Sequence, residues 1–134
     1  MTKVSGSCHC GAVRFEVEEP EQVLDCNCSH CRLYGALVAY YPQSEVRFAG
    51  KPDTFIYQWG DRDLEFHHCR TCGCATHTTI AGVEMADKIA VNARLIRGLD
   101  PKRTKLVQKN NGNDGVFWTK TDSPVLPSHD EPRT

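Results

Sequence analysis

The sequence predicts a mainly β fold: a small domain with several short strands and few short helices. Short runs of β-branched and aromatic residues recur between turn residues along most of the chain. Apolar residues show little helical periodicity, and the eight cysteines lie in three close clusters. Because each short strand contributes little core, such a fold gains stability from metal ions that join distant segments.

The first clear strand is expected at residues 12–17. Val13, Phe15 and Val17 would share one face, and Arg14 and Glu16 the other, which is typical of a half-buried strand. The segment 54–59 (TFIYQW) is rich in β-branched and aromatic residues, so it is expected to be strand core. The remaining strands are expected at residues 37–41, 46–48, 64–68, 75–80 and 88–93.

Helices are expected in two places only. One is a turn at residues 29–34, and the other is a segment at 101–108, where Asp100 suits the N-cap and Pro101 the first helical position. Residues 110–115 (NNGNDG) predict a loop. Residues 121–134 hold three of the seven prolines and little apolar pattern, so we expect one domain over 1–120 and an extended or disordered tail.

Composition narrows the classes of protein. A chain of 134 residues is long enough for one domain with a hydrophobic core, and its net charge of −1 offers no bulk attraction for nucleic acid or anionic membrane. No apolar run reaches the roughly 20 residues of a membrane-spanning helix. Residues 1–10 are polar and lack a secretory apolar segment, so a cytoplasmic location is expected. Cytosolic thiols stay reduced, which favours metal or redox chemistry over four disulfides.

The first and third cysteine clusters together predict a closed structural metal site. Cys8 and Cys10 supply two ligands from a turn, and Cys69 and Cys72 supply two more across the two-residue gap of a zinc knuckle. Gly73 permits the tight backbone turn that a knuckle requires. Four thiolates complete a tetrahedral zinc site that would join the start of the chain to its middle.

The second cluster predicts a different kind of site. Cys26, Cys28 and Cys31 are three ligands within six residues, and three protein ligands with one exchangeable position are typical of catalytic zinc. Three thiolates make the ion a poor Lewis acid and a poor activator of water. Such a site suits a substrate thiol, which it would bind as thiolate for attack on a carbon electrophile. Cys74 is the alternative: it could close this cluster as a second structural site.

The order and spacing of these clusters resemble the glutathione-dependent formaldehyde-activating family, which also includes centromere protein V. The resemblance rests on residues 6–15 (GSCHCGAVRF), 26–31 (CNCSHC) and 69–73 (CRTCG), and it extends more weakly through 88–100 to about residue 120. It implies a fold of the β-tent type. It also implies a structural zinc on Cys8, Cys10, Cys69 and Cys72 and a catalytic zinc on Cys26, Cys28 and Cys31.

The activity implied by this resemblance is the addition of glutathione to formaldehyde, which gives S-(hydroxymethyl)glutathione and is classed with carbon–sulfur lyases. The leading hypothesis is therefore a two-zinc enzyme that joins a small thiol to a small aldehyde, with no nucleic acid or membrane partner. His30, inside the second cluster, is the candidate catalytic acid, or else a loop residue. The alternatives are a non-catalytic zinc scaffold and a redox sensor that uses Cys74.

The remaining candidate residues have structural interpretations of equal weight or greater. His9 is expected to face solvent, His68 to be packed, and His77 to lie on a sheet surface. Tyr57 and Trp59 are candidates for lining a pocket, although core packing is the first expectation. The candidates for binding the carboxylates of glutathione are the basic residues Arg32, Arg70 and Arg94.

Overall fold

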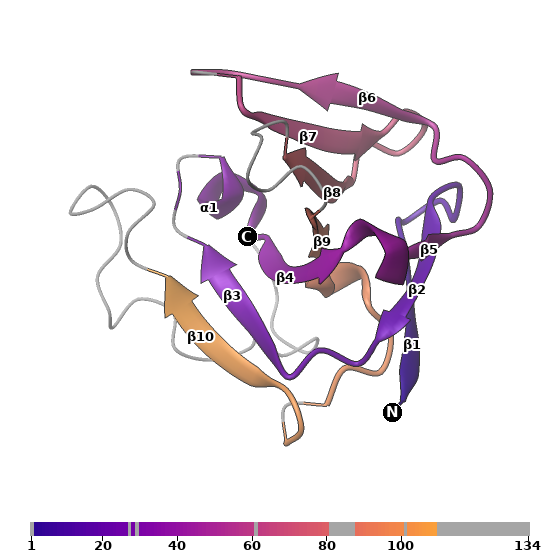
Figure 1. Ribbon diagram of the computed structural model, residues 1–134. Helices are drawn as coiled ribbons and strands as arrows, with labels where there is room; N and C mark the ends of the chain where they lie inside the picture. Colours follow the sequence, from indigo (N-terminus) through magenta and orange to yellow (C-terminus); the bar gives the residue numbers. More distant parts are fainter. Residues whose placement is uncertain are drawn as a thin grey trace.

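Two β-sheets make up most of this computed structural model (Figure 1). The structure describes residues 2–26, 28, 30–60, 62–80, 88–100 and 102–109. Within these ranges the regular structure is almost entirely strand, with one α-helix of four residues and two short 3₁₀ turns. The mainly β prediction is therefore confirmed. None of the helical segments in these ranges has the length and apolarity that a membrane span requires.

The smaller sheet is built from the N-terminal part of the chain in the order β1-β2-β5, with antiparallel pairing throughout. Its strands are β1 (Lys3–Ser7), β2 (Arg14–Glu18) and β5 (Arg47–Phe48). On β2 the side chains of Phe15 and Val17 are buried, while Arg14 and Glu16 are exposed. This is the alternation that the sequence predicts.

The larger sheet has the order β10-β3-β4-β9-β8-β7-β6. Its strands are β3 (Gln22–Cys26), β4 (Leu37–Pro42), β6 (Thr54–Tyr57), β7 (Leu64–Cys69), β8 (Ala75–Ile80), β9 (Lys88–Asn92) and β10 (Lys105–Lys109). Only the β10–β3 pair is parallel. In Figure 1 the sheet twists from β10 and β3 at the lower left to β6 at the top.

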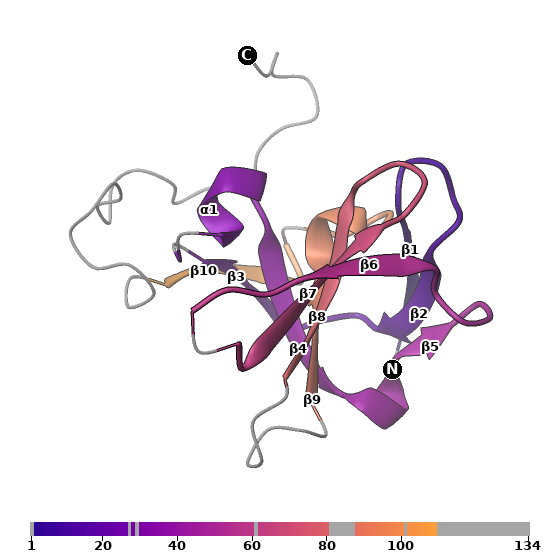
Figure 2. The same ribbon diagram turned by 90° about the horizontal axis from the view of Figure 1, so that it is seen from above.

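The helical elements are short connections. The helix α1 (Cys31–Tyr34) follows β3, and the 3₁₀ turns are Gln43–Glu45 and Ala93–Leu95. Figure 2 shows α1 on one side of the β6–β7 hairpin and the smaller sheet on the other, and Figure 1 shows the same separation. Strand β7 of this hairpin ends at Cys69, so the first and third cysteine clusters meet at one end of the hairpin, and α1 begins with Cys31 of the second cluster.

The main core lies where the smaller sheet packs against β3, β4 and β9. Its buried residues come from alternate positions of these strands, because one face of each strand points toward the other sheet. They are Phe15, Val17, Val23, Leu37, Ala39, Tyr41, Val46, Ile89, Val91, Ala93 and Ile96. A second apolar cluster surrounds Cys26 and Cys31, so the second cysteine cluster belongs to the interior of the protein.

The helix predicted at residues 101–108 is wrong, because this segment contains strand β10. The Asp100 side chain accepts a hydrogen bond from the Lys102 amide at 2.9 Å, as an N-cap would, but the turn ends at once. The Thr104 hydroxyl then donates to the Pro20 carbonyl at 2.8 Å, which sets β10 beside β3. Pairing with β3 satisfies more backbone groups than a short isolated helix would. The predicted loop at 110–115 and the tail at 121–134 lie outside the described residues.

Two histidines on adjacent central strands stack on each other. The rings of His67 and His77 have centroids 4.2 Å apart and planes 15° apart. The His67 ring nitrogens lie 2.8 Å from the Thr54 hydroxyl and 3.0 Å from the Thr79 hydroxyl. His77 Nδ1 lies 2.8 Å from the Thr76 hydroxyl. Threonine side chains thus satisfy both imidazoles inside the sheet.

The prediction that His77 lies on a sheet surface is wrong, since only 6% of its surface is exposed. Strand β8 has a neighbour on each side, and the ring of Phe48 from the smaller sheet lies 4.8 Å from the His77 ring. Burial, with a smaller effect of His67, lowers the pKa of His77 from 6.5 to about 3. Burial also lowers the pKa of His67. Both imidazoles are neutral in the folded protein at pH 7.

Acid should destabilise the fold through His77. Between pH 6.5 and about 3 the unfolded chain binds a proton at this residue that the folded chain does not, so the free energy of unfolding falls as the pH falls. From pH 7 to pH 5 this loss amounts to roughly 2 kcal/mol. Urea unfolding should show that His77→Gln, which cannot titrate, loses less stability over this interval. Equal losses of stability in the two proteins would show that His77 is not the group responsible. Acid effects on metal binding are the same in both proteins and cancel in the comparison.

Candidate metal centres

Four cysteine sulfurs meet between the turn that follows β1 and the turn that joins β7 to β8. The sulfurs of Cys8, Cys10, Cys69 and Cys72 all lie within 4.8 Å of one another. The Cys8–Cys10 and Cys10–Cys69 sulfur distances are both 3.7 Å. A tetrahedral zinc ion with Zn–S bonds of about 2.3 Å requires sulfurs about 3.8 Å apart. The spacing and the donor type therefore both fit zinc.

Tight turns at two glycines bring these sulfurs together. Gly11 and Gly73 have φ angles of +83° and +80°, which residues other than glycine rarely adopt. The Gly73 amide donates to the Cys69 carbonyl at 2.9 Å, and the Gly11 amide donates to the Cys8 carbonyl at 3.2 Å. Each turn curls the backbone around its own cysteine pair, as the sequence predicts for Gly73.

The electrostatics of this four-sulfur cluster favour a bound cation. Backbone amides of Cys10 and Cys74 donate to the Cys72 sulfur and lower its pKa to about 5. The Ala12 amide acts in the same direction on Cys10, but desolvation and the neighbouring sulfurs raise the pKa of Cys10 to about 12. Without a cation, the four thiols cannot all ionise at neutral pH. A dication in their midst would remove this conflict.

Three further sulfurs form the second cluster at the end of β3. Cys26 closes the strand and Cys31 opens α1, and the Cys31 amide donates to the Cys28 sulfur at 3.2 Å. The three sulfurs lie within 4.8 Å of one another, and among the described residues no fourth histidine, cysteine or carboxylate joins them. This three-sulfur cluster provides the donor set of a metal site with one position left over.

The sulfurs of the three-sulfur cluster are electrostatically unequal. Hydrogen bonds from the Cys26 and Cys31 thiols, with amides of Cys31 and His30, lower the pKa of Cys28 to about 2. The thiols of Cys26 and Cys28 in turn raise the pKa of Cys31. One thiolate therefore forms readily and opposes the ionisation of its neighbours. A metal cation is the ordinary way to hold three such sulfurs ionised together.

Cys74 belongs with the four-sulfur cluster and not with the three-sulfur cluster. It packs against Cys8, Val13 and Cys69, and its carbonyl accepts the Cys69 amide at 2.9 Å. It is therefore not positioned as a fourth ligand for the second cluster. None of the eight cysteines forms a disulfide in this structure.

His30 lies beside the three-sulfur cluster inside an aromatic cage. Only 8% of its surface is exposed, and its ring stacks on Phe66 with centroids 3.8 Å apart. The Tyr34 and His68 rings lie 4.8 Å and 5.7 Å away. Neither ring nitrogen of His30 has a hydrogen-bond partner among the described residues. Burial lowers its pKa, so the imidazole is neutral and one of its nitrogens can donate a hydrogen bond.

The other two predicted histidines behave as expected from the sequence. His9 is exposed, and His68 is buried in packing contacts with its Nδ1 3.3 Å from the Gly73 carbonyl oxygen. The basic candidates are already engaged: Arg70 pairs with Asp53 at 3.0 Å, and Arg94 donates to the Gly35 carbonyl. Arg32 is the third candidate and also has an interaction within the protein.

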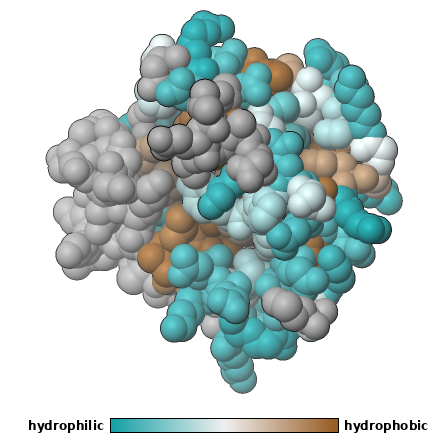
Figure 3. Space-filling view, viewed as in Figure 1, coloured by the Kyte–Doolittle hydropathy of each residue, from teal (hydrophilic) through white to brown (hydrophobic). Residues whose placement is uncertain are grey.

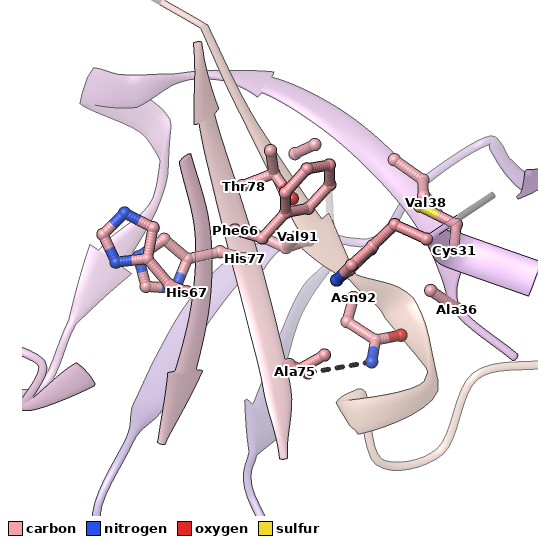
Figure 4. Close-up of a pocket in the computed structure, with 12 residues that line it drawn as sticks. Cys31, Ala36, Val38, Phe66, His67, Ala75, His77, Thr78, Val91 and Asn92 are labelled. Carbon is pink, nitrogen blue, oxygen red and sulfur yellow. Dashed lines mark hydrogen bonds between the residues drawn. The ribbon is translucent and has the colours of Figure 1, made fainter. Parts of the chain in front are cut away.

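A small cavity lies on the inner side of the three-sulfur cluster (Figure 4). Its volume of about 20 Å³ is enough for one water molecule. Its lining reaches from Cys31, Ala36 and Phe66 to the stacked histidine pair. The Asn92 amide donates to the Ala75 carbonyl at 2.9 Å across its lower end in Figure 4. The cavity is too small to admit a substrate.

An open hollow of about 400 Å³ lies on the outer side and shares His30 with the inner cavity. Its other lining residues are Leu33, Tyr34, Tyr57 and Trp59. Strand core was the first expectation for residues 54–59, and it is wrong for Tyr57 and Trp59, which are 49% and 43% exposed. The strand β6, which this segment contains, is the edge strand of the larger sheet. Leu33 and Tyr34 were not singled out by sequence reasoning.

Comparisons with known proteins agree with this arrangement. Residues 3–109 match the family model described as glutathione-dependent formaldehyde-activating enzyme. A crystal structure of a protein from Rhodobacter sphaeroides is similar, with a TM-score of 0.63 and 32% sequence identity. The alignment covers 78% of this chain and 99% of that one. The matched region contains all seven cysteines of the two clusters.

Substituting Cys72 and Cys74 in turn should show which of these two cysteines of the β7–β8 turn binds a metal and which only packs. Cys72→Ser should lose one zinc per chain and lower the free energy of unfolding by more than about 4 kcal/mol, because a metal link between distant segments is lost. Cys74→Ser, two residues away, is the matched control and should keep its zinc and most of its stability. Elemental analysis and urea unfolding measure both quantities. Equal zinc loss in the two variants would contradict the ligand assignment.

Proposed function

The chain belongs to the glutathione-dependent formaldehyde-activating enzyme family, and on this basis we propose that it is a zinc-dependent carbon–sulfur lyase. It would join a small thiol, glutathione, to a small aldehyde and split the same adduct. One observation carries the proposal: a cluster of three sulfurs, with no fourth ligand among the described residues, lies beside a buried histidine whose ring nitrogens have no partner there. A cytoplasmic location is part of this proposal, because cytosolic thiols stay reduced and available for metal binding.

Two zinc ions are proposed, with different roles. Cys8, Cys10, Cys69 and Cys72 would hold a structural ion, since four sulfurs complete a tetrahedral site. Cys26, Cys28 and Cys31 would hold the catalytic ion, and that ion would supply an open position at which the substrate sulfur binds as a thiolate. The fit rests on the sulfur spacing and on the preference of zinc for thiolate donors.

The reaction forms one carbon–sulfur bond and moves one proton. The substrate sulfur adds to the carbonyl carbon, the carbon–oxygen π bond breaks, and the oxygen takes up a proton to give the hydroxyl of a hemithioacetal. The thiol loses its proton in exchange, so no oxidant or other reactant is needed. In the reverse direction the carbon–sulfur bond breaks and the hydroxyl proton leaves.

His30 would supply the proton to this oxygen. Its neutral imidazole offers one N–H donor, and the stack on Phe66 fixes the ring without the help of protein hydrogen bonds. One ring nitrogen can take up the proton that the thiol releases while the N–H of the other gives a proton to the developing oxyanion, so the ring is neutral before and after the reaction. Phe66 and Tyr34 exclude water from the faces of the ring, which strengthens that hydrogen bond.

Loss of a sulfur from the three-sulfur cluster should abolish activity and leave the fold. Cys28→Ser removes the most acidic of these thiols, so turnover should fall by more than the roughly 100-fold typical of losing an outer-sphere partner. The measurement is the exchange rate between formaldehyde and its glutathione adduct by NMR, with the uncatalysed rate subtracted. Glutathione should also change the visible spectrum of the cobalt-substituted protein. If the unsubstituted protein does not accelerate the exchange and glutathione does not change the cobalt spectrum, the proposed function is wrong.

The role of His30 can be tested without disturbing the aromatic cage. His30→Phe keeps a ring between Phe66 and Tyr34 but removes both nitrogens, so kcat should fall by about 100-fold while stability is retained or increased. The cobalt spectrum with glutathione should be unchanged, because thiol binding does not require the imidazole. An unchanged kcat would show that water, and not His30, protonates the oxygen.

A further inference from the structure

We propose that the aldehyde substrate carries a large uncharged group, aromatic or similarly apolar, and that the outer hollow binds this group. The inference rests on the proposed function and concerns its substrate class. The hollow is defined by His30, Leu33, Tyr34, Tyr57 and Trp59. Its place, size, composition and exposure each lead to this conclusion.

The hollow begins at the reacting centre. His30 is part of its wall and is also the neighbour of Cys31 in the chain, so a carbonyl group that contacts His30 would lie at the mouth of the hollow. The Tyr57 ring is stacked against the His30 ring at 6.1 Å and 19°. Whatever is bonded to the carbonyl carbon would therefore extend between α1, which carries Leu33 and Tyr34, and the end of β6.

The size of the hollow does not match a one-carbon aldehyde. Its volume of about 400 Å³ lies within the range of roughly 300–1,000 Å³ that is usual for ligand pockets. Formaldehyde has two heavy atoms and would leave nearly all of this space to water. A group the size of a phenyl ring would contact both walls.

The chemistry of the walls indicates an uncharged occupant. Leu33, Tyr34, Tyr57 and Trp59 present apolar or aromatic surface and carry no charge at neutral pH. None of these four residues offers a cation that could form an ion pair with the carboxylates of a thiol such as glutathione. The hollow therefore suits the aldehyde part of the adduct and not the thiol part.

The exposure of these side chains also requires an explanation. Leu33 is 71% exposed and Trp59 is 43% exposed, whereas large apolar residues are usually buried. In the space-filling view of Figure 3 most of the surface is hydrophilic, and separate hydrophobic patches appear at the top, at the right and left of the centre. Exposed apolar and aromatic side chains that line one hollow beside a reactive centre are characteristic of a binding site.

Two aldehydes that differ by one phenyl ring test the proposal. Acetaldehyde and phenylacetaldehyde would be compared, each with glutathione, by NMR exchange with uncatalysed rates subtracted. We expect kcat/KM for phenylacetaldehyde to exceed that for acetaldehyde by at least tenfold. Trp59→Ala should reduce this ratio about tenfold, and Trp59→Phe should restore most of it. Ile56→Ala is the matched control: Ile56 is 47% exposed on the same edge strand but does not line the hollow.

Each other outcome overturns the proposal in a distinguishable way. If acetaldehyde and phenylacetaldehyde react equally well, or Trp59→Ala lowers both equally, the hollow does not bind the aldehyde group although the proposed function stands. If formaldehyde and glutathione also fail to react, the proposed function itself is wrong. If sedimentation shows a dimer that Trp59→Ala and Ile56→Ala both dissociate, a second copy of the chain covers the hollow.

Discussion

Crowding of sulfur atoms is the constraint on which the rest of the structure depends. Four sulfurs lie within 4.8 Å of one another where the turn after β1 meets the β7–β8 turn. Two unit charges 4 Å apart at an effective dielectric constant of 20 repel by about 4 kcal/mol, so four thiolates at this spacing require a cation between them. With the cation, the same cluster joins the smaller sheet to the far end of the larger one. The main core, around Val17 and Val91, joins the sheets at the other end.

The three-sulfur cluster has the same chemistry in a different setting. Cys26 ends β3, which is paired on both sides by β10 and β4, Cys31 begins α1, and Cys28 lies in the connection between them. The rigid strand and the short helix hold three donors close together. Cys74, the candidate fourth donor, is occupied in the packing of the other cluster. One cluster thus has four cysteine donors, and the other has three among the described residues.

The surroundings of His30 are unusual for a residue with only a structural role. A buried polar group without a partner costs on the order of 1–3 kcal/mol, and buried polar atoms in native proteins nearly always have one. Here both nitrogens of one imidazole lack a partner among the described residues, while aromatic rings on several sides hold the group in place. The cost of leaving these nitrogens without a partner beside three sulfurs is the physical reason why we propose a chemical role for His30.

The sequence by itself predicted the cysteine groups that could hold metal ions and most of the strands. Cysteine spacing is local, and a two-residue gap with a following glycine converges on an ion whatever surrounds it, as at Cys69, Cys72 and Gly73. Strands with a clear alternation, such as β2, were equally predictable. The strands β1 and β3 were not predicted, because β1 contains serine and glycine and β3 carries the polar Asp25 among its buried positions.

Tertiary structure alone decided which strand is an edge and which lies in the middle of the sheet. That order made residues 105–109 a strand, because pairing with β3 is a contact between distant parts of the chain that no local pattern encodes. It buried His77 on a central strand and exposed Tyr57 and Trp59 at the edge, although all three lie in similar β-forming segments. A segment's own sequence sets its tendency to form a strand, but burial depends on the neighbours that the whole chain brings beside it.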